Sequence, residues 1–414
     1  MGFMQAGWRL AIEQRHAVAA RTGRTVFVGG AGDFDKDGRI RHAGDLRAQI
    51  AGTIDNLNAA LALEGATLAD AVRLKVYYTP AKDLDEWAVR ALIQNHAAFA
   101  ALDPLPALSM MPVPLQPFEG QAVQIQAIAI VGWRSAPRAH ALSRAVPASA
   151  AKQFQRPIYT AGLRAGEFIT APLRCATGED GKLLHQGDAV AQSHAIMNDL
   201  AATLRHLGAG LQDAIKMEGY YFGTTHKDWA PLGAARASHF REPGPVATVV
   251  PCHVLDPDGA RTKIEVMAFR GDNGVHNKYI PREDCWPETV WDWSLPLPYR
   301  QGLRLRNQIW TGGQVPYDRG TTADPTVFPT DVLKQTGFTM GLCNDIVEGF
   351  GRSTRDYRLL VCYFTSKGSE RETRAFIDAV AERIDGRLPP MTIVPQPHMH
   401  TDDCLVEIWG IAES

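Results

Sequence analysis

The chain is poor in cysteine and has no excess of charge of either sign. Its six cysteines in 414 residues show no C-x-x-C spacing, which indicates reduced thiols in a cytoplasmic protein. Lys and Arg number 43 against 45 Asp and Glu, for a formal net charge of −2. The chain therefore lacks the basic excess that is typical of a nucleic-acid or anionic-membrane partner.

Long apolar runs are lacking as well. The longest apolar stretch, residues 97–115, contains Asp103 and four prolines, which excludes a membrane helix there. The first residues lack the basic and apolar regions of a secretory signal peptide. Hydrophobic residues at 45% and charged residues at 21% exclude a disordered chain, so we expect a folded protein without a membrane partner.

What the sequence does contain is a threefold internal repeat. Four residue types recur at a constant interval of 143 residues: Gln49, Gln192 and Gln335; Gly65, Gly208 and Gly351; Asp70, Asp213 and Asp356; Tyr77, Tyr220 and Tyr363. Four matched columns without a gap, within a window of about thirty residues, indicate three tandem copies of one unit.

Each copy predicts the same order of elements. Apolar residues at helical spacing, such as Ile50, Ile54 and Leu61, predict a helix that the glycine column ends. A strand follows at 72–78, 214–221 and 357–364, then a second helix. Next come a P-x-x-[ST]-x-x-P signature at 106–112, 245–251 and 389–395, and a closing strand at 123–129, 263–268 and 405–412.

With two strands before the first helix, each copy is predicted to be an α+β sheet with both helices on one face. We expect copy one at residues 1–132, copy two at 153–270 and copy three at 295–414. Segments 133–152 and 271–294 are predicted linkers, because the first is rich in Ala, Arg, Ser and Pro and the second in Asp, Trp and Pro.

Several short motifs resemble one known family. In copy three, Pro298-Tyr299-Arg-Gln301-Gly302 resembles a PYxQG segment, Thr311-Gly312-Gly313-Gln314 a TSGQ turn, and Val406-Glu407-Ile408 a VEIE strand. These are motifs of the RidA/YjgF family of enamine/imine deaminases. Copy two keeps Tyr159 and Glu265 at the tyrosine and glutamate columns, whereas copy one has His16 and Gln124 there.

The resemblance implies three RidA-like domains with a chorismate mutase-like fold. Members of this family form homotrimers with ligand clefts between subunits, so three fused copies imply an intramolecular pseudo-trimer. We therefore expect a monomer, with a dimer through outer surfaces as the alternative. The resemblance implies a small-molecule substrate and neither cofactor nor metal. The net charge disfavours the ribonuclease role sometimes attached to the family.

One departure from the family is important for the substrate. The family deaminases hold the substrate carboxylate with an arginine in the signature segment, through a bidentate pair. Leu108, Ala247 and Met391 occupy that column here. Activity on small 2-imino acids is therefore not expected to follow from the resemblance.

The candidate catalytic residues are Glu407, Glu265 and Tyr299. Each glutamate lies mid-strand between apolar neighbours, where it is either a proton shuttle or a solvent-facing side chain. Tyr299 is either a hydrogen-bond donor in a cleft or a buried structural residue.

The candidate substrate-binding residues form a larger set, and its members are Tyr159, Gly312, Gly313, Thr392, Thr248, His398 and His253. Backbone N–H groups beside the signature Ser/Thr are suited to an anionic oxygen. His398 or His253 is a candidate for the missing cation.

Other residues have weaker support. His16 is a candidate base or a structural histidine, and the tyrosine column is expected in the core. His398 and His400 form a His-x-His pair, but the other copies have nothing like it, which disfavours a metal site.

Two functions, and a third that is less favoured, remain open from the sequence. The first is a metal-free hydrolase acting on an imine, an enamine or a related ring or enol-ether substrate. The second is a non-catalytic small-molecule binder with clefts between the copies. The third is a structural member of a catabolic enzyme complex.

Overall fold

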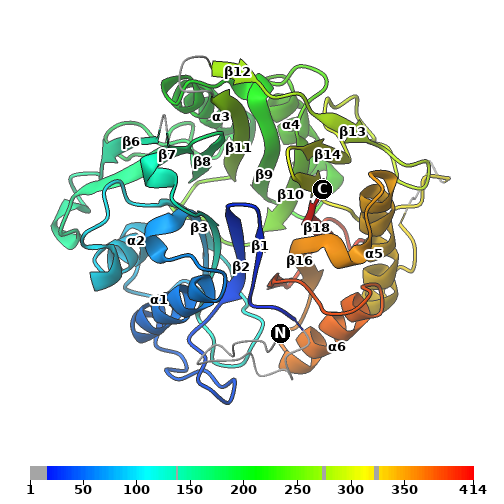
Figure 1. Cartoon of the computed structure of the whole chain (residues 1–414), viewed down its shortest axis with the longest axis horizontal. Coiled ribbons are helices and arrows are strands. Elements are labelled where there is room, and N and C mark those ends of the chain that lie inside the picture. Colours follow the sequence, from blue (N-terminus) through cyan, green and yellow to red (C-terminus); the bar gives the residue numbers. More distant parts are fainter. Residues whose placement is uncertain (1–15, 137–138, 273–276, 321–325) are drawn as a thin grey trace.

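Three similar units surround a common centre, with strands inside and α-helices at the periphery (Figure 1). The computed structural model describes residues 16–136, 139–272, 277–320 and 326–414. Residues 1–15, with which copy one was predicted to begin, lie outside the described residues. The other described elements confirm the α+β class, with three mixed sheets and six α-helices in the described part of the chain.

Copy one forms a five-stranded sheet in the order β1-β2-β5-β3-β4, in which only β3 and β4 are parallel. Its elements are β1 (Ala19–Thr22), β2 (Thr25–Ala31), α1 (Leu46–Leu63), β3 (Ala71–Tyr78), α2 (Glu86–Gln94), β4 (Ala107–Pro112) and β5 (Val123–Ile130).

Copy two repeats this order and adds two strands, one at an end of the sheet and one beside the closing strand. Its repeated elements are β7 (Ile158–Ala165), β8 (Phe168–Arg174), α3 (Ala189–His206), β9 (Ala214–Phe222), α4 (His226–Ala237), β10 (Val246–Cys252) and β11 (Thr262–Asp272). The added strands are β6 (His140–Ala145), which pairs with β7, and β12 (Asn277–Tyr279), which pairs with β11.

Copy three forms a six-stranded sheet in the order β13-β14-β15-β18-β16-β17. Its elements are β13 (Glu283–Cys285), β14 (Gly302–Leu305), β15 (Gln308–Thr311), α5 (Val332–Gly349), β16 (Tyr357–Thr365), α6 (Glu370–Ala381), β17 (Met391–Gln396) and β18 (Val406–Glu413). Because β6, β12 and β13 all come from segments 133–152 and 271–294, those segments are not mere linkers as predicted: they add strands to the sheets.

The repeated residue columns perform the same structural task in each copy. Gly65, Gly208 and Gly351 have φ values of 70°, 77° and 74°, so each ends its helix in the left-handed conformation. Each column glutamine lies in the first turn of the long helix, where its amide bonds backbone groups of the two flanking loops. Each column aspartate accepts backbone hydrogen bonds from the turn that precedes the central strand.

The start of each copy lies against the signature strand region of the copy before it. Arg300 of copy three bridges to Val246 in β10, and Thr160 of copy two donates to the Leu105 carbonyl at 2.7 Å. Ala17 of copy one donates to the carbonyl of Leu388, just before β17, at 2.9 Å. This last contact closes the ring between copies three and one.

The tyrosine column meets at the centre of the ring. The Tyr363 hydroxyl lies 2.9 Å from that of Tyr77 and 2.8 Å from that of Tyr220, and the Tyr77–Tyr220 pair is separated by 3.4 Å. All three side chains are fully buried, as the core assignment from the sequence predicted. A hydroxyl both donates and accepts, so three of them satisfy one another where water is absent.

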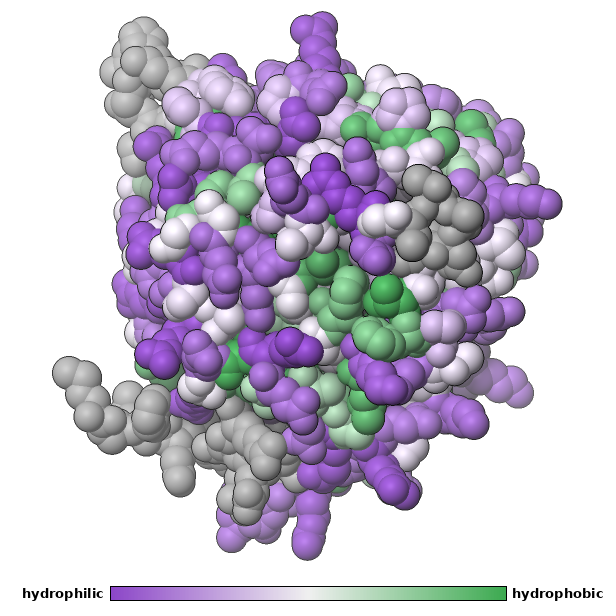
Figure 2. Space-filling view, turned by 90° about the vertical axis from the view of Figure 1, so that its right-hand side faces the viewer, coloured by the Kyte–Doolittle hydropathy of each residue, from purple (hydrophilic) through white to green (hydrophobic). Residues whose placement is uncertain are grey.

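The face drawn in Figure 2 is mostly hydrophilic. Figure 2 looks at the right-hand side of Figure 1 and shows hydrophobic side chains gathered near the middle of a polar face. No helix in the described ranges is long and apolar enough to cross a bilayer.

The closed ring leads to a prediction about assembly. Sedimentation at low protein concentration should give a monomer near 45.3 kDa, because the three inter-copy surfaces are already buried within one chain. A constitutive homotrimer would contradict this expectation, whereas a dimer through outer surfaces would not.

The tyrosine cluster can be tested by removing one hydroxyl. Tyr363→Phe should lower the free energy of unfolding by about 1–3 kcal/mol, because it leaves two buried hydroxyls short of a partner. Tyr357→Phe is the matched control, since its hydroxyl is buried without a hydrogen-bond partner among the described residues. Denaturant unfolding should show a loss for the first variant and little change, or a gain, for the second.

Candidate functional site

Each pair of neighbouring copies meets where the closing strand of one copy faces the signature strand of the copy before it. The register of the sheets identifies the equivalent position in each closing strand as the residue opposite the column tyrosine. This residue is Gln124 opposite Tyr77, Lys263 opposite Tyr220, and Glu407 opposite Tyr363.

The placement of Glu265 at the glutamate column is therefore wrong by two residues. Glu265 pairs with Glu218, not with Tyr220, and Lys263 holds the position equivalent to Glu407. A slip of two residues keeps a side chain on the same face of the strand, so hydrophobic alternation alone does not detect it.

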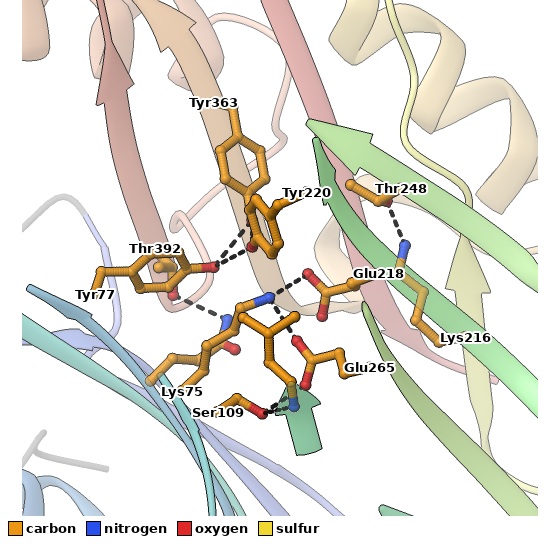
Figure 3. A network of polar contacts seen from close by, with 12 residues as sticks. Lys75, Tyr77, Ser109, Lys216, Glu218, Tyr220, Thr248, Glu265, Tyr363 and Thr392 are labelled. Atoms are coloured by element: carbon orange, nitrogen blue, oxygen red, sulfur yellow. Dashed lines mark hydrogen bonds and ion pairs between the residues drawn. The ribbon is translucent and has the colours of Figure 1, made fainter. Parts of the chain in front are cut away.

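Glu265 lies in a buried ion cluster between copies one and two (Figure 3). The Arg73 guanidinium donates to Glu265 at 2.9 Å and to Glu218 at 3.0 Å, and Lys75 Nζ lies 2.7 Å from both carboxylates. Ser109 of the signature also donates to Glu265, at 2.7 Å. Burial alone would raise the pKa of Glu265, but the charges of Arg73 and Lys75 outweigh it and lower that pKa.

The rest of the same interface is also filled from within. Lys263 forms an ion pair with Glu86 at the start of α2, and its ammonium donates to the Met110 carbonyl at 2.9 Å. The signature of copy one is therefore occupied by protein groups: Ser109 bonds the ion cluster, and the Met110 carbonyl bonds Lys263.

The interface between copies three and one is filled by amides. Gln124 donates to the Ile393 carbonyl at 2.8 Å, and Gln126 donates to the Thr392 hydroxyl at 3.0 Å. Thr392, a predicted substrate-binding residue, is thus occupied by a protein partner and lies at a different interface from Glu407.

The interface between copies two and three holds a cavity of about 320 Å³. Glu407 and His400 both line it, and His400 Nε2 lies 2.7 Å from a carboxylate oxygen of Glu407. His400 Nδ1 lies 3.3 Å from the Tyr221 hydroxyl, so the three side chains form one hydrogen-bonded series. Burial and the charge of Glu407 raise the pKa of Tyr221 well above its ordinary value, which keeps the hydroxyl protonated.

The glycine turn of copy three makes room for this carboxylate. A Cβ on Gly313 would lie 2.0 Å from Glu407 Oε1 and 2.9 Å from Thr248 Oγ1, so no larger residue fits without moving one of them. Gly313 N–H donates to the Ala247 carbonyl at 2.7 Å, while Val249 N–H donates to Glu407 Oε1 at 3.3 Å. Gly312 N–H donates to the Gln301 carbonyl at 2.6 Å and supports the turn from behind.

Aromatic side chains form the walls of the cavity. Trp291 and Trp293 lie edge to face with ring centroids 4.7 Å apart, and Tyr317 lies edge to face with Trp291 at 5.6 Å. Trp229 enters from α4 of copy two. The two tryptophans belong to segment 271–294, so a stretch that composition marked as a linker supplies much of the site.

A buried lysine lies behind the cavity. Lys216 Nζ donates to Thr248 Oγ1 at 2.6 Å (Figure 3). It also donates to the Thr311 carbonyl at 3.2 Å and lies 3.9 Å from the Trp409 ring centroid. Burial lowers the pKa of Lys216 to about 7, although Glu218 and Glu407 oppose the shift. Thr248, a predicted substrate-binding residue, therefore lies between this lysine and the Gly313 turn.

The remaining predicted residues lie outside the cavity wall. Tyr299 is buried against Phe240 and Trp293, so it supports a wall residue from behind. Tyr159 packs against Trp87 at the interface between copies one and two. The His253 ring donates to the His398 carbonyl at 3.1 Å, and the His398 ring lies 3.5 Å from Asp402.

Burial and side-chain partners bear on the other histidine candidates. Burial lowers the pKa of His16 to about 4, which makes it a neutral core residue at neutral pH. His398 and His400 point to different partners, Asp402 and Glu407, and no group of three metal-ligating side chains occurs among the described residues.

Sequence reasoning missed His400, Trp291 and Trp293. His400 was visible only as half of a His-x-His pair, and its partner Glu407 lies seven residues further on. The tryptophan-rich stretch 286–293 was a compositional signal that was assigned to a linker. Together these residues give the cavity one proton-transfer pair inside an aromatic enclosure, an arrangement suited to acid–base chemistry on a small unsaturated molecule.

Comparison with known proteins agrees with the repeated architecture. The model of the endoribonuclease L-PSP family matches residues 9–131 and 140–270. Among solved structures, a chorismatase is similar over 83% of this chain and 93% of its own, with 14% identity and a TM-score of 0.54. That likeness shows the fold of most of the chain.

Two single-domain structures from E. coli match one copy's length each. The YjgF gene product is 24% identical and covers 32% of this chain and 98% of its own, with a TM-score of 0.27. TdcF with bound serine is 20% identical over 32% of this chain and 98% of its own, with a TM-score of 0.28.

The two glutamates should respond differently to neutralisation. Glu265→Gln should lower the free energy of unfolding by about 3–5 kcal/mol, because Arg73 and Lys75 would be left with one carboxylate. Glu407→Gln should cost much less, since Glu407 pairs with the imidazole of His400, to which a glutamine can still hydrogen-bond. Urea unfolding of both variants at pH 7 checks this, and equal losses would contradict the assignment of Glu265 to the ion cluster.

Proposed function

Because this chain belongs to the endoribonuclease L-PSP family, also called RidA/YjgF, we propose that it is a hydrolase of small imines, enamines or enol ethers. Its working cleft lies between copies two and three. The observation that carries the proposal is the Glu407–His400 pair, 2.7 Å apart, in the wall of a cavity of about 320 Å³.

The pair has the properties that hydrolysis of such substrates requires. Protonation of carbon or nitrogen must be followed by removal of a proton from water, so the same groups must give and take a proton. A carboxylate and an imidazole in direct contact share one proton and exchange it without solvent. Tyr221 orients the imidazole by its contact with Nδ1.

The steps balance when the pair carries one proton more than a carboxylate and a neutral imidazole. Glu407 delivers that proton to the β-carbon of an enamine or enol ether, the carbon–carbon double bond supplies the electrons, and an iminium or oxocarbenium ion forms. An imine reaches the same stage by protonation at nitrogen.

Water then adds to the electrophilic carbon, and its released proton returns to the pair through Glu407. His400 then passes a proton to the departing nitrogen or oxygen. At the same time the hydroxyl group of the addition product gives its proton to the pair, and the carbonyl forms. The products are a carbonyl compound and an amine or alcohol, and the pair regains its starting proton. This chemistry needs neither a metal nor a cofactor.

The signature residues disfavour small 2-imino acids as substrates. Leu108, Ala247 and Met391, at the column of the family arginine, are all buried apolar side chains. Without a bidentate cation, the loss in transition-state binding of such a carboxylate is about a hundredfold or more. We therefore expect weak or absent turnover of 2-iminopropionate.

The family name also raises the question of RNA. The cavity rim carries Asp292 and Asp318 beside a single arginine, Arg319, and the whole chain has a net charge of −2. A phosphate backbone is attracted by clustered Lys and Arg, so these charges favour a small molecule over a nucleic acid. We also place the protein in the cytoplasm, because all six cysteines are free thiols and five of them are buried.

The competing proposal is a non-catalytic binder. The aromatic walls support it, since Trp229, Trp291 and Trp293 would hold an apolar ligand without any proton transfer. The two proposals differ in the fate of the ligand, because a binder returns it unchanged after hours of incubation.

The catalytic proposal is tested by removing the carboxyl group. Glu407→Gln should leave the fold intact and lower the rate constant by about 10²–10⁴-fold on any substrate found in a panel of imines, enamines and enol ethers. His400→Gln should also lower it and change the pH profile. Asp402→Asn, an exposed residue of the same loop, is the control and should stay active. Full activity of Glu407→Gln would exclude this mechanism.

A further inference from the structure

The charge and the walls of the cavity between copies two and three select one class of ligand. We infer that this cleft binds molecules that carry a positively charged nitrogen, such as a quaternary or protonated tertiary ammonium or an iminium. The inference rests on the proposed function, because it takes the same cleft as the working site, and it adds the chemical class of the substrate.

The first observation is the arrangement of the aromatic rings. Trp291 is nearly perpendicular to both neighbours, at 80° to Trp293 and 74° to Tyr317. Rings set at such angles form adjacent walls instead of one stack, so a small group between them meets more than one ring. The negative faces of tryptophan and tyrosine attract a cation placed over them, and tryptophan does so most strongly.

These rings are held in place before a ligand arrives. Trp286 Nε1 donates to the Trp291 carbonyl at 3.2 Å, and Tyr299 packs against Trp293 from behind at a centroid distance of 5.8 Å. Trp291 itself is only 5% exposed. A preformed enclosure of rigid rings loses little entropy on binding, which favours selective recognition of a compact group.

The second observation is the sign of the charge around the cavity. Three carboxylates line it, Glu407 in the wall and Asp292 and Asp318 at the rim. Among the lining residues that the structure describes, Arg319 is the only permanent cation, and its guanidinium donates to the Pro287 carbonyl. Among the lining side chains, with His400 and His226 either neutral or protonated, the acidic groups equal or outnumber the basic ones, which disfavours an anionic ligand in direct contact with them. The buried cations Lys216 and Arg236 lie behind this lining, next to Thr248 and Tyr299.

The two features also fit the reaction. Protonation of an enamine by Glu407 creates an iminium cation and restores the carboxylate beside it. Aromatic faces and a carboxylate stabilise that cation more than the neutral enamine, so the enclosure binds the reacting state more tightly than an uncharged substrate. A ligand that is already cationic gains the same attraction from the outset.

The test compares three probes of nearly equal shape. Choline, its neutral isostere 3,3-dimethylbutan-1-ol and the anion 3,3-dimethylbutyrate are titrated into the full chain, and binding is followed by tryptophan fluorescence and calorimetry. We expect choline to bind at least about tenfold more tightly than the alcohol, and the anion to bind most weakly. Equal affinity for choline and the alcohol would overturn the inference.

Variants locate the binding. Trp291→Leu and, separately, Trp229→Leu should each weaken choline binding severalfold, and Glu407→Gln should narrow the preference for choline over the alcohol. Trp87→Leu, at the interface between copies one and two, is the matched control and should bind choline as the parent does. Choline binding that none of the three cleft variants weakens would place the cation elsewhere and also overturn the inference.

Failure of this inference is distinguishable from failure of the proposed function. None of the probes can be hydrolysed, so the affinity order is read without turnover. If the protein hydrolyses neutral substrates but binds choline no more tightly than the alcohol, the Glu407–His400 mechanism stands and the inferred preference for cationic ligands is wrong. A clear preference for choline, with no turnover of any substrate, would retain the class and favour the non-catalytic binder.

Discussion

The fold depends on the need to satisfy polar groups that the three sheets bury against one another. Each copy presents the same positions of its central and closing strands to a neighbour, where water has no access. A charge or amide at these positions is tolerable only if the neighbouring copy supplies its partner. Arg73 and Lys75 of copy one are matched by Glu218 and Glu265 of copy two in this way. The amides of copy one meet the signature of copy three.

Fusion into one chain is what permits such matching. In a trimer of identical subunits, a lysine at the position of Lys75 would occur three times at related sites, with no subunit free to provide carboxylates instead. Here that position differs in each copy. Lys75 lies opposite Gln126 in copy one, Glu218 opposite Glu265 in copy two, and Val361 opposite Trp409 in copy three. Two interfaces have thereby become closed structural contacts. The third keeps the Glu407–His400 pair facing a cavity, so the copies have diverged into two filled interfaces and one that contains a cavity.

Much of the fold followed from the sequence because the repeat is local and regular. The glutamine, glycine and aspartate columns keep one task per copy, and the helices and strands begin and end close to where periodicity placed them. The site was less accessible. Glu407 and Gly313 were identified through the family motifs, but Glu265 was aligned two residues out of register, a shift that preserves the strand face. His400 and the two tryptophans gain their meaning from contacts between copies, and pairings so distant in sequence leave no local pattern.

The contact of Ala17 with Leu388 closes the ring without a covalent link, unlike the other two junctions, which the chain itself spans. Copies three and one are therefore the pair that can separate farthest while every peptide bond stays intact. This junction is the one filled by Gln124 and Gln126. The cleft with Glu407 lies at a tethered junction, wrapped by the segment that carries Trp291 and Trp293. The junction that the chain does not span and the cavity are thus kept apart in the ring.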